Sequence, residues 1–196
     1  MTGIILSGGK NTRIGTNKAF LKIIGMEIIE IIVDKFKDIF EEIIVVTNST
    51  EEYQHLEVKL VKDIIPNKDS LGGLYSGLVN SKNQYNFVVA CDMPFVNVEL
   101  IKFMKSNYNS FDVVVPKLKN GYEPLHAIYS KNCIGPVKKQ IERNNLKIID
   151  FFSEVRVKEI TEDTIRQFDP QLLSFFNINT EDDYQQALNI AMSLRT

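Results

Sequence analysis

The sequence predicts an α/β fold, a Rossmann-like three-layer α/β/α sandwich whose sheet is mostly parallel, with a small antiparallel addition near residues 112–130. Short β-branched and apolar runs at residues 4–6, 43–46 and 87–91 are typical of strands buried on both faces. Between them lie segments whose apolar residues recur every three to four positions, as core-facing helices require. Strand and helix alternate through the first two-thirds of the chain, which favours a parallel sheet covered on both faces.

The first half of the chain contains the clearest alternation. The run Ile4–Leu6 ends at Gly8 and Gly9, where the missing Cβ atoms let the chain turn sharply and bring its amides close to a ligand. The following expected elements are a helix over residues 28–40, strands over 43–46 and around 60–61, and a loop over 72–79 that enters a helix and whose glycines permit close packing.

The second half of the chain contains capping and turn signals. Asn97 is a suitable N-cap for a helix that continues to about Met104, and Thr180 with Asp183 forms a capping box for the last helix. Gly121 marks a turn between two strands, which predicts a hairpin with antiparallel character. The expected elements are strands over 87–91, 112–116, 125–129, 155–160 and 175–178, helical segments over 134–142 and 146–152, and a last helix whose buried stripe ends at Leu194.

Size and composition limit the class of protein. A chain of 196 residues can bury one substantial core, and we expect residues 1–196 to form a single domain. The formal net charge is -2 with both signs mixed along the chain, so we expect no nucleic-acid partner. The sequence contains no targeting pattern and no apolar run of membrane-spanning length, which predicts a cytoplasmic protein without a membrane partner.

Three residues have side chains that often serve in reactive or metal sites. Cys91 and Cys133 are too few for a disulfide framework and lack the spacing of a metal site, so we expect two buried thiols. His126 lies between apolar residues of an expected strand, where a lone histidine is usually a hydrogen-bonded packing residue. We therefore assign none of the three to catalysis.

The segment from Ile4 to Lys18 predicts a phosphate-binding loop. Backbone amides in a turn at Gly8 and Gly9 can form an anion nest, and Arg13 and Lys18 add positive charge in the spacing G-G-x3-R-x-G-x2-K. This combination suits a triphosphate. A Walker P-loop would need Gly-Lys-Ser/Thr at a helix start, and a dinucleotide fingerprint would need G-x-G-x-x-G, and neither pattern is present.

Polar residues follow the expected strands at their carboxyl ends. Asn48, Asp63 and Asp92 each stand there, and in doubly wound sheets the ligand crevice lies outside these ends. Asp92 follows five apolar residues, and an enclosed carboxylate needs a partner. Mg²⁺ that bridges phosphate oxygens would be such a partner, whereas a helix-capping or turn aspartate is the alternative.

The pattern L-S-G-G-x3-R-x-G-x2-K-A-F-L at residues 6–21 resembles nucleotidyltransferases of the sugar-nucleotide pyrophosphorylase type, and most closely the molybdenum cofactor guanylyltransferases. Cys91–Phe95, Glu123–Tyr129 and Asn177–Thr180 are similar to further motifs of that family, so the resemblance covers nearly the whole chain. One departure is Gly72-Gly73-Leu74, where the family usually has Gly-Pro-Leu. The lost proline should alter the stiffness of this loop more than the chemistry.

The resemblance implies an enzyme that transfers GMP from GTP to molybdopterin, with Mg²⁺ as cofactor and pyrophosphate as product. It implies that Lys18 and Arg13 hold the phosphates and that Asp92 binds the metal, so these three are the expected catalytic residues. Asn177 and Asn179 are expected near the second substrate. The expected nucleotide-binding residues are Leu6, Ser7, Gly8, Gly9, Lys18, Asn48, Asp63 and Asp92.

Two other functions stay open at this stage. Cytidylyl-, uridylyl- and thymidylyltransferases share the N-terminal loop, so a cytidylyl- or sugar-phosphate nucleotidyltransferase is the first alternative. The second is a nucleotide-binding partner protein without catalysis, against which Arg13, Lys18 and Asp92 argue, because a binding module can spare its metal ligand. Proteins that deliver the cofactor or accept the product are plausible partners, and no motif for them is visible.

Overall fold

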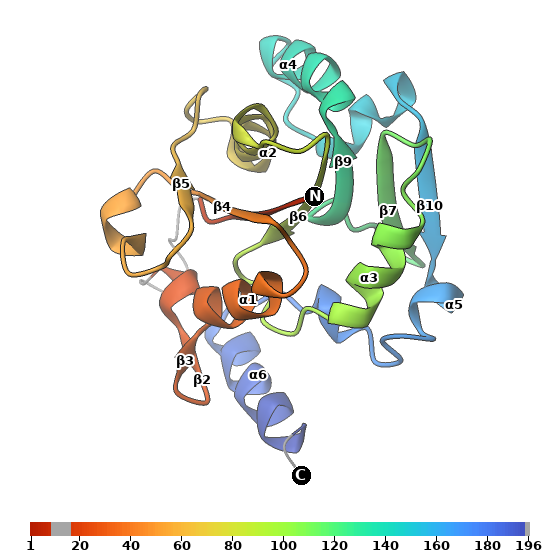
Figure 1. Ribbon diagram of the computed structural model, residues 1–196. Helices are drawn as coiled ribbons and strands as arrows, with labels where there is room; N and C mark the ends of the chain where they lie inside the picture. Colours follow the sequence, from red (N-terminus) through yellow and green to blue (C-terminus); the bar gives the residue numbers. More distant parts are fainter. Residues whose placement is uncertain (9–16, 195–196) are drawn as a thin grey trace.

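A computed structural model describes residues 1–8 and 17–194 (Figure 1). Its centre is an eight-stranded sheet in the order β10-β7-β9-β6-β1-β4-β5, with β8 paired to β7, and a separate two-stranded sheet joins β2 to β3. The strands are β1 (Thr2–Leu6), β2 (Lys22–Ile23), β3 (Met26–Glu27), β4 (Glu42–Val46), β5 (Lys59–Val61), β6 (Tyr85–Ala90), β7 (Val113–Leu118), β8 (Gly121–Tyr122), β9 (His126–Ser130) and β10 (Val157–Thr161).

The direction of the strands confirms a mostly parallel sheet with an antiparallel addition. β1 pairs in parallel with both β4 and β6, β4 with β5, and β7 with β10. β9 runs against both of its neighbours, β6 and β7, and β8 runs against β7. The chain turns from β1 to β4 on one side and later reaches β6 on the other side of β1. The crevice of such a sheet is expected at this reversal of strand order.

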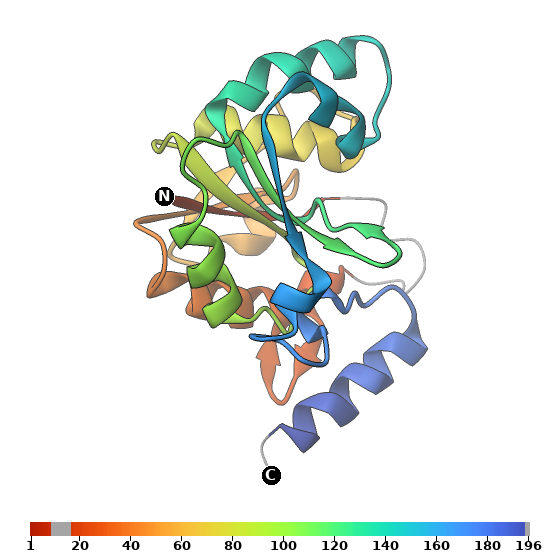
Figure 2. The same ribbon diagram turned by 90° about the vertical axis from the view of Figure 1, so that its right-hand side faces the viewer.

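Helices cover both faces of the sheet, as Figures 1 and 2 show: α2 and α4 lie on one face, and α1 and α3 on the other. Both views show α6 extending away from the sheet beside β2 and β3. The α-helices are α1 (Ile28–Lys37), α2 (Asp69–Asn80), α3 (Val98–Ser106), α4 (Ile134–Glu142), α5 (Glu162–Ile165) and α6 (Glu181–Ser193); the 3-10 turns are η1 (Lys18–Phe20), η2 (Thr50–Tyr53), η3 (Lys131–Cys133), η4 (Ile148–Glu154) and η5 (Leu173–Phe175).

The apolar core consists of two clusters, one on each face of the sheet. On β1, Ile5 packs with the α1 and α3 side, whereas Ile4 and Leu6 pack with the α2 and α4 side. Because successive side chains of a strand point to opposite faces, a run of apolar residues without alternation is needed to fill both clusters. The continuous apolar runs of the sequence therefore form strands that are buried on both faces, as predicted.

The helix caps predicted from the sequence are present. The Asn97 side chain accepts a hydrogen bond from the amide of Leu100 at 3.0 Å, and α3 begins at the next residue after Asn97. Thr180 and Asp183 form the reciprocal capping box of α6. The side chains of these residues satisfy amides that have no partner within the helix, which fixes where α3 and α6 begin.

The prediction of a loop over residues 72–79 is wrong, because α2 already begins at Asp69 and includes the glycines. A Cβ added at Gly77 would lie 2.7 Å from Cγ2 of Ile4, so the glycine lets α2 approach β1 closely. Tertiary packing here outweighs the low helix propensity of glycine. The close packing proposed for these glycines is thus present, but within a helix.

Other boundaries differ from the prediction near the end of the chain. No strand forms over residues 175–178; Leu173–Phe175 is a 3-10 turn, and the amide of Ile178 donates to the carbonyl of Asp92 at 3.0 Å. Residues 148–154 form a 3-10 turn where a helical segment over 146–152 was expected. Leu194 is 62 % exposed, so the buried stripe of α6 ends earlier, at Ala191. Within the described part of the chain, no helix has the length and apolar character needed to cross a membrane.

Candidate active site

A cleft of about 560 Å³ lies at the carboxyl edge of β1, β4, β5 and β6. β9 runs antiparallel to β6, so the start of β9 also reaches this edge and brings Leu125 to the cleft. The strands thus place distant parts of the sequence on one rim, as expected for a doubly wound sheet. The lining residues are Leu6, Gly8, Val46, Asn48, Asp63, Asn67, Asp69, Ser70, Gly73, Ala90, Cys91, Asp92, Leu125, Asn177 and Asn179.

Lys18 contacts two residues that line this cleft, Asp92 and Asn179, although all three are far apart in the sequence. The Lys18 ammonium donates to Asn179 Oδ1 at 2.7 Å and to Asp92 Oδ2 at 3.3 Å. The two charged side chains are only 17 % and 20 % exposed, so water screens this ion pair weakly. The cluster joins the N-terminal segment, the end of β6 and the segment before α6.

The Asp92 carboxylate lies in an environment that disfavours its charge. Burial raises the pKa of Asp92, and the nearby Lys18 ammonium opposes that shift. Asp92 Oδ1 is buried and has no hydrogen-bond partner among the described residues. A buried carboxylate oxygen without a donor is unfavourable unless a cation or another ligand satisfies it. This orphaned oxygen therefore fits a metal ligand.

Asn48 and Asp63 form a reciprocal pair at the ends of β4 and β5. Asn48 Nδ2 donates to Asp63 Oδ2 at 2.8 Å, and the Asp63 amide donates to Asn48 Oδ1 at 3.1 Å. Asp63 Oδ1 is buried and lacks a hydrogen-bond partner within residues 1–8 and 17–194. The pair therefore holds its acceptor group in a fixed position on the wall of the cleft.

The remaining residues predicted for the nucleotide have mixed placements. Leu6 and Gly8 line the cleft. Ser7 is buried and does not line the cleft, and its amide donates to the carbonyl of Val46 at 2.8 Å; its predicted contact with the nucleotide stays a prediction. Gly9 and Arg13 lie outside the described residues.

The two asparagines predicted for the second substrate both line the cleft, but they have different partners. Asn177 Nδ2 donates to the carbonyl of Phe175 at 3.0 Å, whereas Asn179 accepts from Lys18. The Asn179 amide also donates to the carboxylate of Asp183, inside the capping box of α6. The start of α6 therefore fixes the position of Asn179 beside the lysine.

The family of the chain follows from its similarity to known proteins. The sequence model of the MobA-like NTP transferase domain matches residues 3–155, which include β1 to β9 apart from Thr2 and every cleft residue except Asn177 and Asn179. The chain belongs to the MobA-like NTP transferases. The predicted resemblance and the predicted enzyme class, a nucleotidyltransferase, are confirmed.

Individual relatives of this NTP transferase extend over nearly the whole chain. It is 42 % identical over 193 residues to a probable molybdenum cofactor guanylyltransferase of Natranaerobius thermophilus, covering 95 % of this chain and 94 % of that protein. It is 35 % identical over 189 residues to the molybdenum cofactor guanylyltransferase of Desulfosudis oleivorans, with 95 % and 94 % covered. The crystal structure of the molybdopterin-guanine dinucleotide biosynthesis protein A of Archaeoglobus fulgidus superimposes with a TM-score of 0.87 at 27 % identity, covering 98 % of this chain and 100 % of that one.

Several cleft residues of this transferase were not predicted as site residues. Asn67, Asp69 and Ser70 line the cleft from the start of α2, and Asn67 and Asp69 both have positive φ angles, of 59° and 45°. The tolerance of asparagine and aspartate for this backbone region is a weak sequence signal for a tight turn. Because the start of α2 was predicted too late in the chain, these residues were not recognised as lining the cleft.

The thiols and His126 pack as expected with two corrections: Cys91 is only half-buried, and His126 lacks the expected hydrogen bond within the described residues. Burial raises the pKa of both Cys91 and Cys133 to about 12, so both remain protonated at neutral pH; Cys133 is buried, and Cys91 is half-buried. His126 is fully buried between the rings of Phe87 and Phe175. The expected hydrogen bond is wrong, because neither ring nitrogen has a partner in the described part of the chain, and burial lowers the pKa of His126 to about 3.

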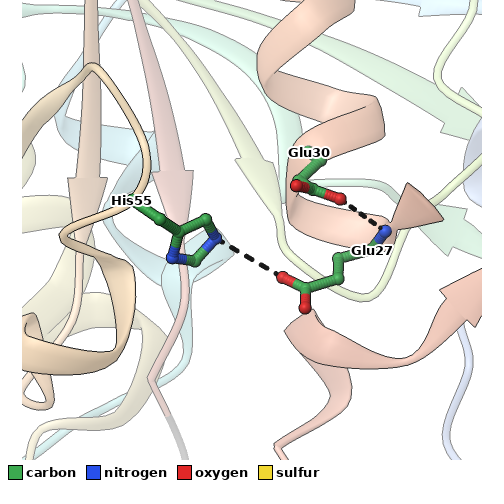
Figure 3. A group of neighbouring side chains, drawn as sticks. All are labelled: Glu27, Glu30 and His55. Carbon is green, nitrogen blue, oxygen red and sulfur yellow. Dashed lines mark hydrogen bonds and ion pairs between the residues drawn. The ribbon is translucent and has the colours of Figure 1, made fainter.

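A second group of potential metal ligands lies away from the cleft, at the start of α1 (Figure 3). Among the described residues, Glu27, Glu30 and His55 bring ligand atoms within 4.8 Å of one another. Glu27 and Glu30 form the capping box of α1, and Glu30 accepts from the Glu27 amide at 2.9 Å. Carboxylates at a helix N-terminus are stabilised by the helix dipole, which also disfavours a cation there. The group is explained by capping and by the contact of His55 with Glu27 at 3.5 Å.

Proposed function

We propose that this chain transfers GMP from GTP to the phosphate of molybdopterin, which gives the molybdopterin guanine dinucleotide and pyrophosphate. The observation that carries the proposal is that Asp92 and Asn179 line one cleft at the carboxyl edge of the sheet and that the Lys18 ammonium bonds to both. The names of the relatives supply the nucleotide and the acceptor. Both reactants are anions, so the site must bring them together and reduce their repulsion.

The transfer needs no general base from the protein. The second pKa of a phosphate monoester is near 6, so the attacking oxygen of molybdopterin is already mostly ionised at neutral pH. The protein then contributes alignment of the two phosphates and positive charge near the reacting phosphorus. Lys18 supplies that charge, and its bonds to Asn179 and Asp92 hold the ammonium at the cleft. Arg13 remains a predicted second cation for the phosphates.

Asp92 is the residue that would hold Mg²⁺. Its unpartnered Oδ1 is a hard anionic ligand, and Mg²⁺ in nucleotide sites typically uses one or two carboxylates together with phosphate oxygens and water. The bound ion would neutralise phosphate charge and act as a Lewis acid. We propose that Asn177 and Asn179, from the segment before α6, contact the second substrate.

The proposed base site is the wall formed by Asn48 and Asp63. Asn48 occupies Asp63 Oδ2, which leaves Oδ1 as an acceptor. Guanine carries N–H donors at N1 and at its exocyclic amino group, whereas adenine and cytosine present an acceptor at the equivalent ring nitrogen. A carboxylate acceptor thus favours GTP over ATP and CTP. Inosine triphosphate, which lacks the 2-amino group, should bind more weakly than GTP.

The test of this function has two stages. Calorimetric titration with GTP, CTP, ATP and UTP, each with and without Mg²⁺, should give the tightest binding for GTP with Mg²⁺. Pyrophosphate release should then require both the preferred nucleotide and molybdopterin. Preference for CTP would replace this proposal by the cytidylyltransferase alternative, and nucleotide binding without any pyrophosphate release would favour the non-catalytic alternative.

Three broader predictions accompany this function. We propose that residues 1–196 act as a single nucleotidyltransferase domain, since β10 completes the sheet beyond the segment that matches the family. A cytoplasmic location stays a prediction. Proteins that deliver molybdopterin or receive the dinucleotide remain the expected protein partners, and gel filtration of mixtures with such proteins would test their association.

A further inference from the structure

Tyr53 is a buried residue whose hydroxyl connects two parts of the N-terminal segment. Its side chain is fully buried at the end of η2, and its ring packs against Phe20 with 4.8 Å between centroids. The hydroxyl lies 2.6 Å from Ser7 Oγ and accepts from Asn17 Nδ2 at 2.9 Å. Ser7 and Asn17 stand on opposite sides of residues 9–16 in the sequence.

Asn17 transmits this contact to Lys18. Its Oδ1 accepts from the amide of Ala19 at 3.2 Å, which caps the turn that begins with Lys18, and its carbonyl accepts from the amide of Phe20 at 3.0 Å. Its Nδ2 also reaches Glu52 Oε2 at 3.1 Å. With both ends of its side chain bound, Asn17 fixes the backbone from which Lys18 reaches the cleft.

The protonation state of Tyr53 suits this role. Burial raises the pKa of Tyr53, so the phenol is neutral at the pH of the reaction. A phenol has one proton to donate and lone pairs to accept with. Since Asn17 donates to the phenol oxygen, the phenol proton is available to Ser7. One hydroxyl can therefore satisfy both neighbours at once.

We propose that Tyr53 is a positioning residue for nucleotidyl transfer: its hydroxyl joins Ser7 to Asn17 and thereby holds Lys18 beside Asp92 and Asn179. This inference rests on the proposed function, because it assigns Lys18 to the phosphates of the nucleotide. Tyr53 does not line the cleft and acts only through its neighbours. Its ring belongs to the core, so the ring and the hydroxyl have separable roles.

The test uses Tyr53→Phe, which keeps the ring and removes the hydroxyl. We expect kcat/KM for the nucleotide to fall by about 10- to 100-fold, the range that follows from a small misplacement of a reacting group. Thermal unfolding and near-ultraviolet circular dichroism establish that the variant is folded. The matched control is Tyr85→Phe, which removes a hydroxyl at the start of β6, the edge of the sheet opposite the cleft, and should keep full activity.

A second background separates positioning from a general structural effect. In a Lys18→Ala protein, Tyr53→Phe should change neither the remaining turnover nor the calorimetric Kd of the nucleotide, because the group that it positions is gone. A folded Tyr53→Phe protein with kcat/KM within threefold of wild type would overturn the proposal. An equal loss with and without Lys18 would overturn it as well.

The assay uses whichever nucleotide the wild-type protein prefers. An error in the GTP assignment therefore appears in the wild-type nucleotide preference, whereas an error in the role of Tyr53 appears only in the variants. If the wild-type protein transfers no nucleotide, the test uses the Kd of the nucleotide for the wild type, for Tyr53→Phe, for Lys18→Ala and for the double variant. Tyr53→Phe must then weaken nucleotide binding only when Lys18 is present.

Discussion

Replacing Asp92 with asparagine removes a buried carboxylate charge from the end of β6 and keeps nearly the same side-chain volume. The Asp92→Asn protein should lose the proposed metal ligand and the partner of Lys18, whose ammonium lies 3.3 Å from the carboxylate. We expect the fold to remain intact, since asparagine can fill the same space. The effect on activity and the effect on stability should then be very different in size.

The effect on stability is small because two contributions oppose each other. At an effective dielectric constant of about 20, the attraction between Lys18 and Asp92 is about 5 kcal/mol before desolvation is counted. Burial disfavours the Asp92 charge enough to raise its pKa in spite of Lys18, so asparagine relieves this penalty while it loses the attraction. We expect the free energy of unfolding at pH 7 to change by no more than about 1 kcal/mol.

The effect on catalysis should be large. Loss of a principal electrostatic group in an active site typically lowers kcat by about 10² to 10³, which corresponds to about 3 to 4 kcal/mol. Pyrophosphate release with the preferred nucleotide and molybdopterin measures this loss, and chemical denaturation measures stability. The control Glu57→Gln removes an exposed carboxylate from the segment between η2 and β5 and should change neither quantity. Turnover by Asp92→Asn at the wild-type rate would refute the reasoning.

Three further predictions concern charge, packing and pH. Lys18→Ala should lower kcat/KM by about 10²-fold or more in the same assay, and retained activity would contradict its role at the phosphates. Gly77→Ala should destabilise the protein by about 1 to 3 kcal/mol in denaturant titrations, because its Cβ would meet Ile4 at 2.7 Å; unchanged stability would mean that α2 shifts freely. Hydrogen bonds from Arg156 hold the pKa of the Asp112 carboxyl well below its usual range, so its stabilising effect is present above about pH 4 and is lost at lower pH. Asp112→Asn should therefore lower stability at pH 7 by about 2 kcal/mol, and the difference from wild type should shrink in acid; a constant difference would contradict this.

Local patterns were sufficient for much of the fold. The apolar runs of β1, β4 and β6 mark central strands because a strand buried on both faces cannot alternate with polar residues. Asn97 and Thr180 mark helix starts because a cap depends on residues only three positions apart. Because the carboxyl ends of parallel strands lie at the same edge of a sheet, the polar residues that follow these strands could be predicted to share one rim before their contacts were known.

The local rules failed where distant packing decides the conformation. Glycines 72, 73 and 77 indicate a loop by propensity, yet they lie in α2 because the helix packs closely on β1. The β-branched and aromatic residues near 175–178 suggest a strand, yet no strand within residues 1–8 and 17–194 pairs with them, and the amide of Ile178 donates to the carbonyl of Asp92 instead. A propensity describes a residue's average surroundings, whereas these two segments have specific partners.

The sequence by itself determined the fold class, the family resemblance and the residue types at the site, because motifs and periodicity are local properties of the chain. Only the tertiary structure decided that Lys18 contacts Asp92 and Asn179, and that Tyr53 joins Ser7 to Asn17. These contacts join residues 36 to 161 positions apart in the sequence; the Tyr53–Asn17 bond has the smallest separation and the Lys18–Asn179 bond the largest. Their geometry depends on strand order and helix packing, which bring distant groups within hydrogen-bonding distance and which no local pattern encodes.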